Sequence, residues 1–564
     1  MVKQIPKFEE MELGADGRLK RAGIELELNP YCRRAVSQAV ELAAARPGSR
    51  VTVITLGPPT AEDALREAIA WGLDHGVDID GVLVTDPAFA GSDTLATAYA
   101  LNAALDHEGP FDLVLTGRNS VDADTGQVGP ELAELCGLPF LSGVRHLAID
   151  GTVVSARCEH DDGWLEAEVD LPAILSCAER LIDPAKVDPP QRAAVPADRI
   201  RILTTEHFRP GPWGQAASPT SVGEVRLMAV TRDRHRTPEA PLVEQVREAV
   251  RVLHERRALE RDATATTHAA IVAPHRPDQP VTIVIVEPDR LHETRELLGA
   301  AARLTGNVHA FTLVNPIDAE LLHSWGADGV VHQTGENVEA EIAAAITRTA
   351  RLGKPWAILA SSTAWGREVA ARVAASLGAG LTGDAVELQR VGNQLVAWKP
   401  AFGGQLVAAI HCSSPVQMAT VRAGVLPTLI PRELGPPAHA PITATMAPQV
   451  RMRILARTRD DDLEPLRKVL DAEFGATRKV TDKGWLPRSR QIGITGRSVA
   501  PRLFVSIGAS GKFNHTVGLR AARTVLAINN DPDALIFQAA DVGIVADWRE
   551  ALPLVVSELQ QAAR

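Results

Sequence analysis

Hydrophobic and polar positions along the first part of the chain follow the pattern of strands that are each followed by a helix. The β-branched runs VTVITL (51–56), GVLVT (81–85) and FDLVLTG (111–117) predict buried strands. Between them lie the runs TAEDALREAIAWG and SDTLATAYALNAAL, which are alanine-rich and compatible with helices. Strands that alternate with helices predict βαβ units around a parallel sheet, which binds its ligands at the carboxyl ends of the strands.

The same alternation begins again after residue 280, with strand-like runs VTIVIVE, NVHAFTLV and WAILASS. The residues between the two blocks are rich in turn formers and include the charged helical run EQVREAVRVLHERRALERD. A third block begins near residue 447 and contains the strand-like run LFVSI, the loop GASGKFNHTVG (508–518) and the run LRAARTVLAIN, which is compatible with a helix. The pattern therefore predicts an α/β protein with two related βα domains, a charged linker and a further block.

Composition and charge narrow the class of protein. A chain of 564 residues is expected to form three or four domains. Its 59 basic and 70 acidic residues give a formal net charge of −11, which excludes a general basic footprint for nucleic acid. No apolar run has the length of about 20 residues that a membrane helix needs, and the first residues, MVKQIPKFEE, do not form a signal peptide. The five cysteines are scattered and form no CxxC pair, so we expect a cytoplasmic protein without a metal site or a disulfide framework.

Two groups of loops carry candidate chemistry. The stretch TGRNSVDADTGQVGP (116–130) stands between a predicted strand and a predicted helix, where free amides can hold a phosphate and Asp122 or Asp124 can accept from a ribose hydroxyl. In the third block, ATRKV (476–480), QIGITGR (491–497) and GASGKFNH (508–515) offer Arg478, Thr495, loop amides and His515. Ordinary alternatives are a capped surface turn, a solvated arginine, a satisfied histidine and a tight turn that needs glycine.

These stretches, taken together, resemble one family. NPYC (29–32), GSDTLATA (91–98), the 116–130 loop and LPAIL (171–175) resemble, in this order, the β subunit of electron-transfer flavoproteins. GREVAARVAASLGAGLTGDAVEL (366–388), QIGITG, GASGKFNH and AINNDPDALIFQAADVGIVAD (527–547) resemble the α subunit. The chain therefore resembles a fusion of both subunits with the β half first.

The resemblance implies four parts. Residues 1–232 are expected to be a β-like domain with AMP or a second FAD, 233–280 a linker with a charged helix, 281–445 an α-subunit N-terminal-like domain, and 446–564 a Rossmann-like FAD-binding domain.

The resemblance also implies the binding residues. It places His515 at the N1/O2 edge of the flavin, Arg478 over its face and Thr495 near N5. The residues expected around the first FAD are Arg459, Thr477, Arg478, Ile492, Gly493, Ile494, Thr495, Ser510, Gly511, Lys512, Phe513, Asn514, His515, Asn529, Asp547 and Trp548, together with Phe8. Those expected around AMP or a second FAD are Asn29, Pro30, Tyr31, Cys32, Gly117, Asn119, Ser120, Asp122, Asp124, Thr125, Gly126, Gln127 and Val128.

Three functions stay open at this point. The first is a carrier that takes electrons from a flavin dehydrogenase, as in fatty acid oxidation, and passes them to a membrane or soluble acceptor of the quinone-oxidoreductase type. The second is an NADH-linked electron-bifurcating flavoprotein with two FADs, a branch that DTGQVGP resembles. The third is a non-redox adenine-nucleotide-binding protein, although the chain lacks the SGGxDS loop of adenylating enzymes. The resemblance also implies that the fusion replaces the αβ heterodimer of the family.

Overall fold

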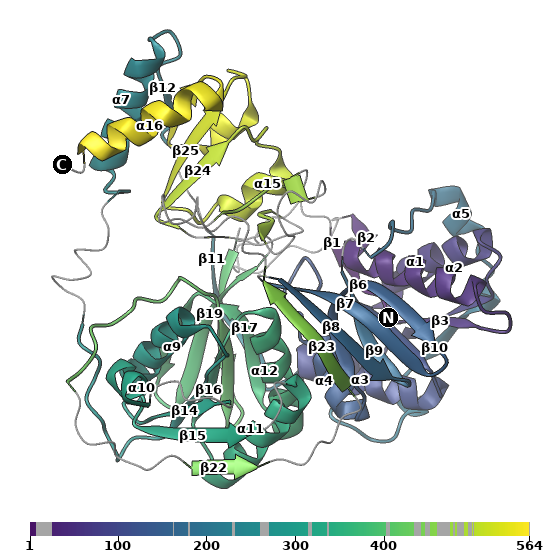
Figure 1. The fold of residues 1–564 in the computed structure, drawn as a ribbon. Coiled ribbons are helices and arrows are strands. Elements are labelled where there is room, and N and C mark those ends of the chain that lie inside the picture. Colours follow the sequence, from purple (N-terminus) through teal and green to yellow (C-terminus); the bar gives the residue numbers. More distant parts are fainter. Residues whose placement is uncertain are drawn as a thin grey trace. The chain divides into compact units, whose positions relative to one another are not determined.

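The three-dimensional structure is a computed structural model of the chain. It describes residues 1–6, 25–161, 163–178, 181–227, 232–259, 270–313, 319–334, 338–401, 406–433, 442–445, 452–459, 474–477, 480, 481, 490–493, 499 and 501–562. The chain divides into two compact units (Figure 1). The large unit consists of Met1–Val225, Ile271–Phe402 and Ala408–Arg459, and the C-terminal unit consists of Arg226–Ala270, Gly403–Val407 and Asp460–Arg564.

The N-terminal subdomain of the large unit, residues 1–217, has the predicted βα alternation. The three predicted strands are β3 (Val51–Leu56), β4 (Ile79–Val84) and β5 (Leu113–Gly117). β3 and β4 are parallel, and β10 (Ile200–Leu203) adds a third parallel strand beside β4. The first residues of the chain lie between β3 and β5, because the Val2 amide donates to Ile54 O and the Met1 amino group donates to Leu115 O.

A mixed sheet of six strands completes this subdomain, in the order β23-β8-β7-β6-β9-β5. β9 is parallel to β5 and β6, whereas β6, β7, β8 and β23 are antiparallel neighbours. Its remaining strands are β6 (Phe140–Asp150), β7 (Val153–His160), β8 (Gly163–Asp170), β9 (Ala173–Cys177) and β23 (Met452–Arg459). The resemblance predicts that the last domain begins at residue 446. In the structure, however, β23 extends this sheet of the large unit.

Helices and short elements complete the N-terminal subdomain. The helices are α1 (Pro30–Ala44), α2 (Glu62–Asp74), α3 (Thr94–Glu108), α4 (Val128–Cys136), α5 (Pro189–Ala193) and α6 (Gly214–Ala217). A small antiparallel pair is formed by β1 (Gln4–Pro6) and β2 (Leu26–Leu28). The Asp93 carboxylate caps α3 by accepting from the Ala96 amide at 3.0 Å. The stretches NPYC and GSDTLATA thus contain the starts of α1 and α3.

The central subdomain, residues 271–445, contains seven parallel strands in the order β17-β21-β16-β13-β14-β15-β22. The strands are β13 (Thr282–Ile285), β14 (Val308–Thr312), β15 (Gly329–Thr334), β16 (Ala357–Ser361), β17 (Gly380–Ala385), β21 (Gln417–Val421) and β22 (Ile442–Thr445). Val284 faces the core under α9 (Leu291–Leu304) and α10 (Ala319–Trp325). Ile283 and Ile285 face the core under α11 (Glu339–Gly353) and α12 (Ala364–Leu377). The sheet is therefore covered on both faces (Figure 1).

A second, four-stranded sheet stands beside the parallel one, in the order β11-β20-β19-β18. Its strands are β11 (Thr220–Leu227), β18 (Glu387–Val391), β19 (Gln394–Ala401) and β20 (Leu406–Cys412). β18 and β19 form an antiparallel hairpin. β11 follows the N-terminal subdomain in the chain, so this sheet adds to the central subdomain a segment that precedes it in the sequence.

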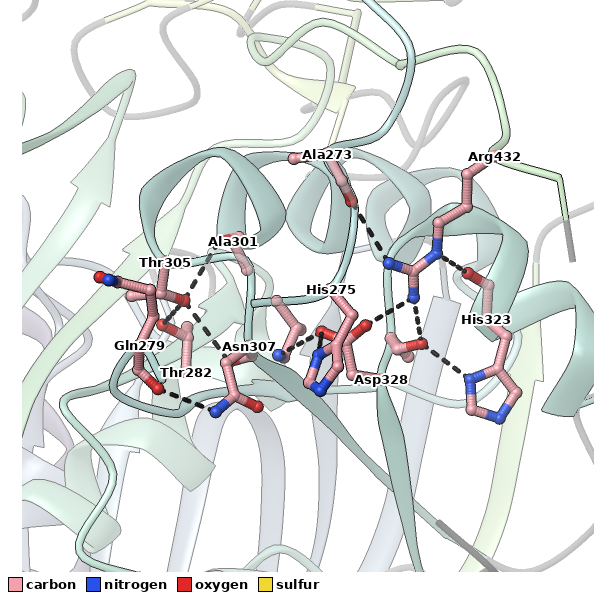
Figure 2. Close-up of polar contacts among 12 residues, drawn as sticks. Ala273, His275, Gln279, Thr282, Ala301, Thr305, Asn307, His323, Asp328 and Arg432 are labelled. Carbon is pink, nitrogen blue, oxygen red and sulfur yellow. Dashed lines mark hydrogen bonds and ion pairs between the residues drawn. The ribbon is translucent and has the colours of Figure 1, made fainter. Parts of the chain in front are cut away.

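The end of the predicted linker is docked on the central subdomain. The Arg432 side chain donates to Ala273 O, His323 O and Ala327 O at 3.3, 3.0 and 2.8 Å, and to the Asp328 carboxylate at 2.7 Å (Figure 2). His275 Nδ1 lies 3.2 Å from the other Asp328 oxygen. These contacts hold residues 271–276 along the amino ends of β14 and β15, so this stretch of the predicted 233–280 linker is packed structure.

The C-terminal unit contains a parallel sheet in the order β12-β26-β25-β24. The strands are β12 (His235–Arg236), β24 (Leu503–Ile507), β25 (Thr524–Asn529) and β26 (Val542–Val545). The charged helix of the predicted linker is α7 (Leu242–Glu255), which packs with α16 (Trp548–Ala562) on one face of this sheet. The apolar side of α7 is buried there, so the helix is part of the unit.

One prediction in this unit is wrong. The run LRAARTVLAIN was expected to be helical, but its second half is β25, which is buried along its whole length and pairs with β24 and β26. The helix after the loop is limited to α15 (Phe513–Thr516), followed by the single 3₁₀ turn Val517–Leu519. Pairing on both edges decided the conformation of Thr524–Asn529, because a central strand satisfies its backbone in the sheet.

Among the residues that the structure describes, no helix combines the length and the apolar character that crossing a membrane requires.

Candidate functional site

Asn29 joins the two predicted nucleotide loops of the N-terminal subdomain. It precedes α1 and is 1% exposed. Its side-chain amide donates to Asn119 O at 2.9 Å and to Cys32 Sγ at 3.3 Å, while its carbonyl oxygen accepts from the Val121 amide at 3.2 Å. The structure therefore brings NPYC and the 116–130 loop together, as the sequence predicted for one site.

The backbone of the 117–128 loop is tightly folded at the carboxyl end of β5. Asp124 and Gly126 have positive φ angles of 47° and 64°, and the Asp124 amide donates to Ser120 O at 2.7 Å. The Asn119 side chain donates to the Asp124 carboxylate. A Cβ on Gly117 would lie 3.0 Å from the Cys32 nitrogen, so glycine permits the close approach of β5 to the start of α1.

Lys3 is a member of this site that sequence reasoning missed. Its ammonium lies 2.9 Å from both Asp122 carboxylate oxygens and 3.1 Å from Ser120 Oγ. Burial would raise the pKa of the Asp122 carboxyl, but the Lys3 ammonium outweighs this effect and the pKa is lowered. Asp122 is therefore ionised and already paired. A lysine near the start of the chain carries no local signal for this role, because the chain fold alone brings it to residue 122.

The other predicted residues of this site lie on the same two segments. Pro30, Tyr31 and Cys32 form the first turn of α1, Thr125 lies in the loop, and Val128 begins α4. Gln127 is the residue before α4, is 2% exposed and donates to Leu381 O of the central subdomain at 3.3 Å. The loop is thereby anchored to both subdomains of the large unit.

A buried polar network lies behind the loop. Thr94 Oγ1 is 2.9 Å from Gln127 Oε1 and 3.0 Å from Glu131 Oε1. Glu131 is fully buried in α4, and burial raises the pKa of its carboxyl to about 8, with a further contribution from the charge of Asp93. Glu131 is thus neutral at pH 7, which lets a carboxyl group lie in the core.

The raised pKa of Glu131 predicts a specific pH dependence of stability. Between its ordinary pKa of 4.5 and about 8, the folded protein binds one proton more than the unfolded chain. The free energy of unfolding therefore falls as the pH rises through this window. Glu131→Gln removes this contribution, so from pH 5 to pH 8 the variant is expected to gain about 2–4 kcal/mol relative to the parent protein.

Urea unfolding of the large unit at pH 5, 6.5 and 8 measures this difference. Glu166→Gln is the matched control, because the Glu166 side chain on β8 is 50% exposed and should change the pH profile little. Parallel pH profiles for the parent and Glu131→Gln would contradict the assignment of a neutral Glu131.

Three loops converge in the C-terminal unit. Ala476 and Gln491 form a parallel β-bridge, with hydrogen bonds from the Ala476 amide to Arg490 O and from the Ile492 amide to Ala476 O. His515 Nδ1 lies 2.9 Å from Ile492 O. Of the predicted residues, Thr477, Ile492 and Gly493 belong to the first two loops, and Ser510, Gly511, Lys512, Phe513, Asn514 and His515 belong to the third loop and α15.

The 508–515 loop leads into α15, which has only four residues, and not into the longer helix that the run LRAARTVLAIN predicted. Asn529, one of the residues predicted around the FAD, orients the loop: its amide donates to Ala509 O and its carbonyl oxygen accepts from the Asp531 amide, both at 2.9 Å.

A cavity of about 220 Å³ lies at the carboxyl ends of β24, β25 and β26. It is lined by Gly508, Ile528, Asn529, Asn530, Ala546, Asp547, Trp548 and Arg549. Trp548 is 41% exposed, and the Arg549 guanidinium lies 4.7 Å from its ring centre. This volume is below the about 300–1,000 Å³ of a drug-sized ligand site, so the cavity is too small to enclose a whole dinucleotide. The predicted residues Asn529, Asp547 and Trp548 are all found in its wall.

Four of the predicted flavin contacts lie outside the residues that the structure describes, namely Phe8, Arg478, Ile494 and Thr495. Arg459 is described by its backbone only, which pairs with Gly163 in the large unit. The cavity residues Asn530, Ala546 and Arg549 were not predicted individually, although their position directly after β25 and β26 is a usable signal in a parallel sheet.

Comparison with known proteins agrees with this geometry. The family model "Electron transfer flavoprotein domain" matches residues 16–198 and 282–450, and "Electron transfer flavoprotein FAD-binding domain" matches residues 456–520. The chain is 38% identical over 181 residues to the electron transfer flavoprotein subunit beta of Clostridium acetobutylicum, which covers 32% of this chain and 67% of that protein. It is 32% identical over 305 residues to the electron transfer flavoprotein subunit alpha of Thermoanaerobacterium thermosaccharolyticum. The matched residues are 47% of this chain and 92% of that protein.

A third relative is the caffeyl-CoA reductase-Etf complex subunit CarD of Acetobacterium woodii. It is 34% identical over 223 residues, which are 39% of this chain and 83% of that protein. Relatives of the β subunit match the N-terminal part of this chain, and relatives of the α subunit match the rest. This order is consistent with a β–α fusion.

Proposed function

Because the chain belongs to the electron transfer flavoprotein family, we propose that it carries electrons through an FAD bound in its C-terminal unit. In this proposal a flavin dehydrogenase supplies the electrons and a quinone-linked oxidoreductase accepts them. The observation that carries the proposal is the convergence of the three loops around Ala476, Ile492 and His515, next to a cavity at the carboxyl ends of the same sheet. FAD supplies the one- and two-electron chemistry, and the loops hold and orient it.

The N-terminal loop supports an adenine nucleotide as a second ligand. Its backbone has two left-handed residues, Asp124 and Gly126, as in turns whose amides bind anions, and Asn29 fixes it against the start of α1. In the carrier this ligand is AMP, which has no redox role.

An electron-bifurcating flavoprotein is the second candidate function. The sequence DTGQVGP in the loop favours it, and one relative belongs by its name to a reductase–Etf complex. In this case a second FAD replaces AMP, and NADH is the electron donor.

The numbers of FAD and adenine nucleotide molecules bound per chain distinguish the carrier from the bifurcating flavoprotein. The purified full chain is denatured, and released FAD and adenine nucleotides are counted per chain. One FAD and one AMP with slow reduction by NADH supports the carrier, whereas two FADs with fast NADH oxidation supports bifurcation. A colourless protein that cannot be reconstituted with FAD would reject both and leave a non-redox nucleotide-binding protein.

We expect His515 to influence the reduction potential of the bound flavin. Burial lowers the pKa of its imidazole, although the hydrogen bond to Ile492 O acts in the opposite direction. Because a carbonyl accepts from Nδ1, that nitrogen carries the proton of the neutral ring, and Nε2 gains a proton only in the imidazolium form. His515 is therefore placed to take up a proton when negative charge develops beside it.

His515→Ala is expected to make the potential for the first electron more negative, on the order of 60–130 mV, the equivalent of a charge-assisted hydrogen bond. It should also flatten the dependence of this potential on pH between 6 and 8. Reductive titration with reference dyes measures both. His254→Ala is the control, because His254 is an exposed histidine on α7 of the same unit and is not among the predicted FAD contacts. An unchanged potential in a fully flavinated His515→Ala protein would show that the imidazole is not next to the flavin.

A further inference from the structure

Lys399 is a buried lysine. It lies on β19 in the central subdomain and is 8% exposed. In the part of the chain that the structure describes, its ammonium has no hydrogen-bond partner. A buried ammonium is costly unless an anion compensates it. Burial accordingly lowers the pKa of Lys399, while Asp384 and Asp124 act in the opposite direction.

The charged groups around Lys399 are unbalanced. Arg422 and Arg367 are the other cations, and Asp384 and Asp124 are the anions. The Asp384 carboxylate is already paired with two arginines, because Arg422 donates to it and the Arg367 guanidinium lies 3.3 Å from it. Two arginines thus share Asp384, and the Lys399 ammonium has no hydrogen-bonded anion among the described residues. An anion is the missing component.

This place adjoins the 117–128 loop. Asp124 of the loop influences both Lys399 and Arg422. A Cβ on Gly383, beside Asp384, would lie 2.9 Å from Gln127 Nε2 and 3.6 Å from Thr125 O. Gln127 also donates to Leu381 O. The 117–128 loop, which we expect to hold a nucleotide phosphate, thus lies on one side of a contact between the subdomains. The Lys399 ammonium lies on the other side of this contact.

We propose that Lys399, with Arg422 beside it, binds the phosphate of the adenine nucleotide that the 117–128 loop holds, so that the central subdomain completes the nucleotide site of the N-terminal subdomain. This inference rests on the proposed nucleotide site and names a second segment that recognises its ligand. It also predicts that the phosphate, rather than the nucleoside, connects the two subdomains.

Binding of AMP and of adenosine to the full-length chain, freed of nucleotide by extensive dialysis, tests the proposal. Lys399→Met should weaken AMP binding about tenfold to a hundredfold, the value of one charge-assisted hydrogen bond, and leave adenosine binding unchanged. Lys399→Arg should recover part of the loss. Without nucleotide, Lys399→Met should melt no lower than the parent protein, because it removes an uncompensated buried charge.

Lys354→Met is the matched control. Lys354 is an exposed lysine at the end of α11, and the same change there should leave AMP binding unaltered. If the parent protein has AMP affinity and Lys399→Met keeps it, or loses adenosine equally, Lys399 does not bind the phosphate. A protein that holds FAD but binds no added adenine nucleotide would also overturn this inference and leave the carrier function intact. A protein without FAD whose AMP binding depends on Lys399 would reject the carrier and retain the inference.

Discussion

Replacing Gly511 by alanine is expected to weaken FAD binding by about fivefold to more than a hundredfold, because overpacking against backbone costs about 1–3 kcal/mol. Gly511 has a φ angle of 74°, and an added Cβ would lie 1.9 Å from the Ile536 nitrogen and 2.4 Å from the Leu535 carbonyl carbon. Ile536 is fully buried in the core of the unit, so it cannot give way. The 508–515 loop must therefore move, and His515 moves with it.

Equilibrium dialysis or flavin fluorescence with the full-length chain measures this loss. Gly392→Ala is the control for the left-handed backbone itself: Gly392 has a φ angle of 62°, but no atom lies within 4 Å of its added Cβ. That variant should lose only about 1 kcal/mol of local stability and keep its FAD. Normal FAD affinity in Gly511→Ala would mean that the loop does not contact the cofactor.

Replacing Asp541 by asparagine is expected to destabilise the C-terminal unit by about 3–5 kcal/mol, because breaking a buried ion pair leaves an uncompensated charge. The Asp541 carboxylate is fully buried and lies 2.8 Å from Arg232 and 2.7 Å from Arg256. It also accepts from the Val525 amide at 2.8 Å, at the start of the central strand β25. Asp541 therefore attaches the segment that contains α7 to the sheet.

Urea unfolding of the C-terminal unit, with FAD release as the readout, measures this effect. Glu248→Gln is the control, because Glu248 pairs with Arg251 on the surface of α7 and exposed pairs contribute less than about 1 kcal/mol. Equal unfolding midpoints for the parent and Asp541→Asn would show that the Arg232 and Arg256 contacts contribute nothing to the stability of this unit.

Local sequence patterns were enough to predict the elements whose buried side chains recur with a simple period along the chain. The strands β3, β4, β5 and β24, the start of α1 and the start of α3 were read from the sequence, because β-branched runs, Asn-Pro and an aspartate cap act over a few residues. The loops were identified in the same way, because glycines and hydroxyl residues at the carboxyl ends of strands are local signals. The family followed from the order of these stretches.

What local patterns could not decide depends on partners from distant parts of the chain. The run that forms β25 has helix-compatible residues, and only its two neighbouring strands made it extended. The charged helix α7 looked like part of a linker, because the sheet face that covers its apolar side comes from residues about 300 positions later.

The polar interior of the sites was decided in the same way. Lys3 pairs with Asp122, Glu131 is neutral, and Lys399 has no hydrogen-bond partner among the described residues. Each of these depends on the tertiary structure, which removes the groups from water and determines their neighbours. Charge and burial act through space, so a sequence can name the residues that bind but cannot say which of them are already paired with one another.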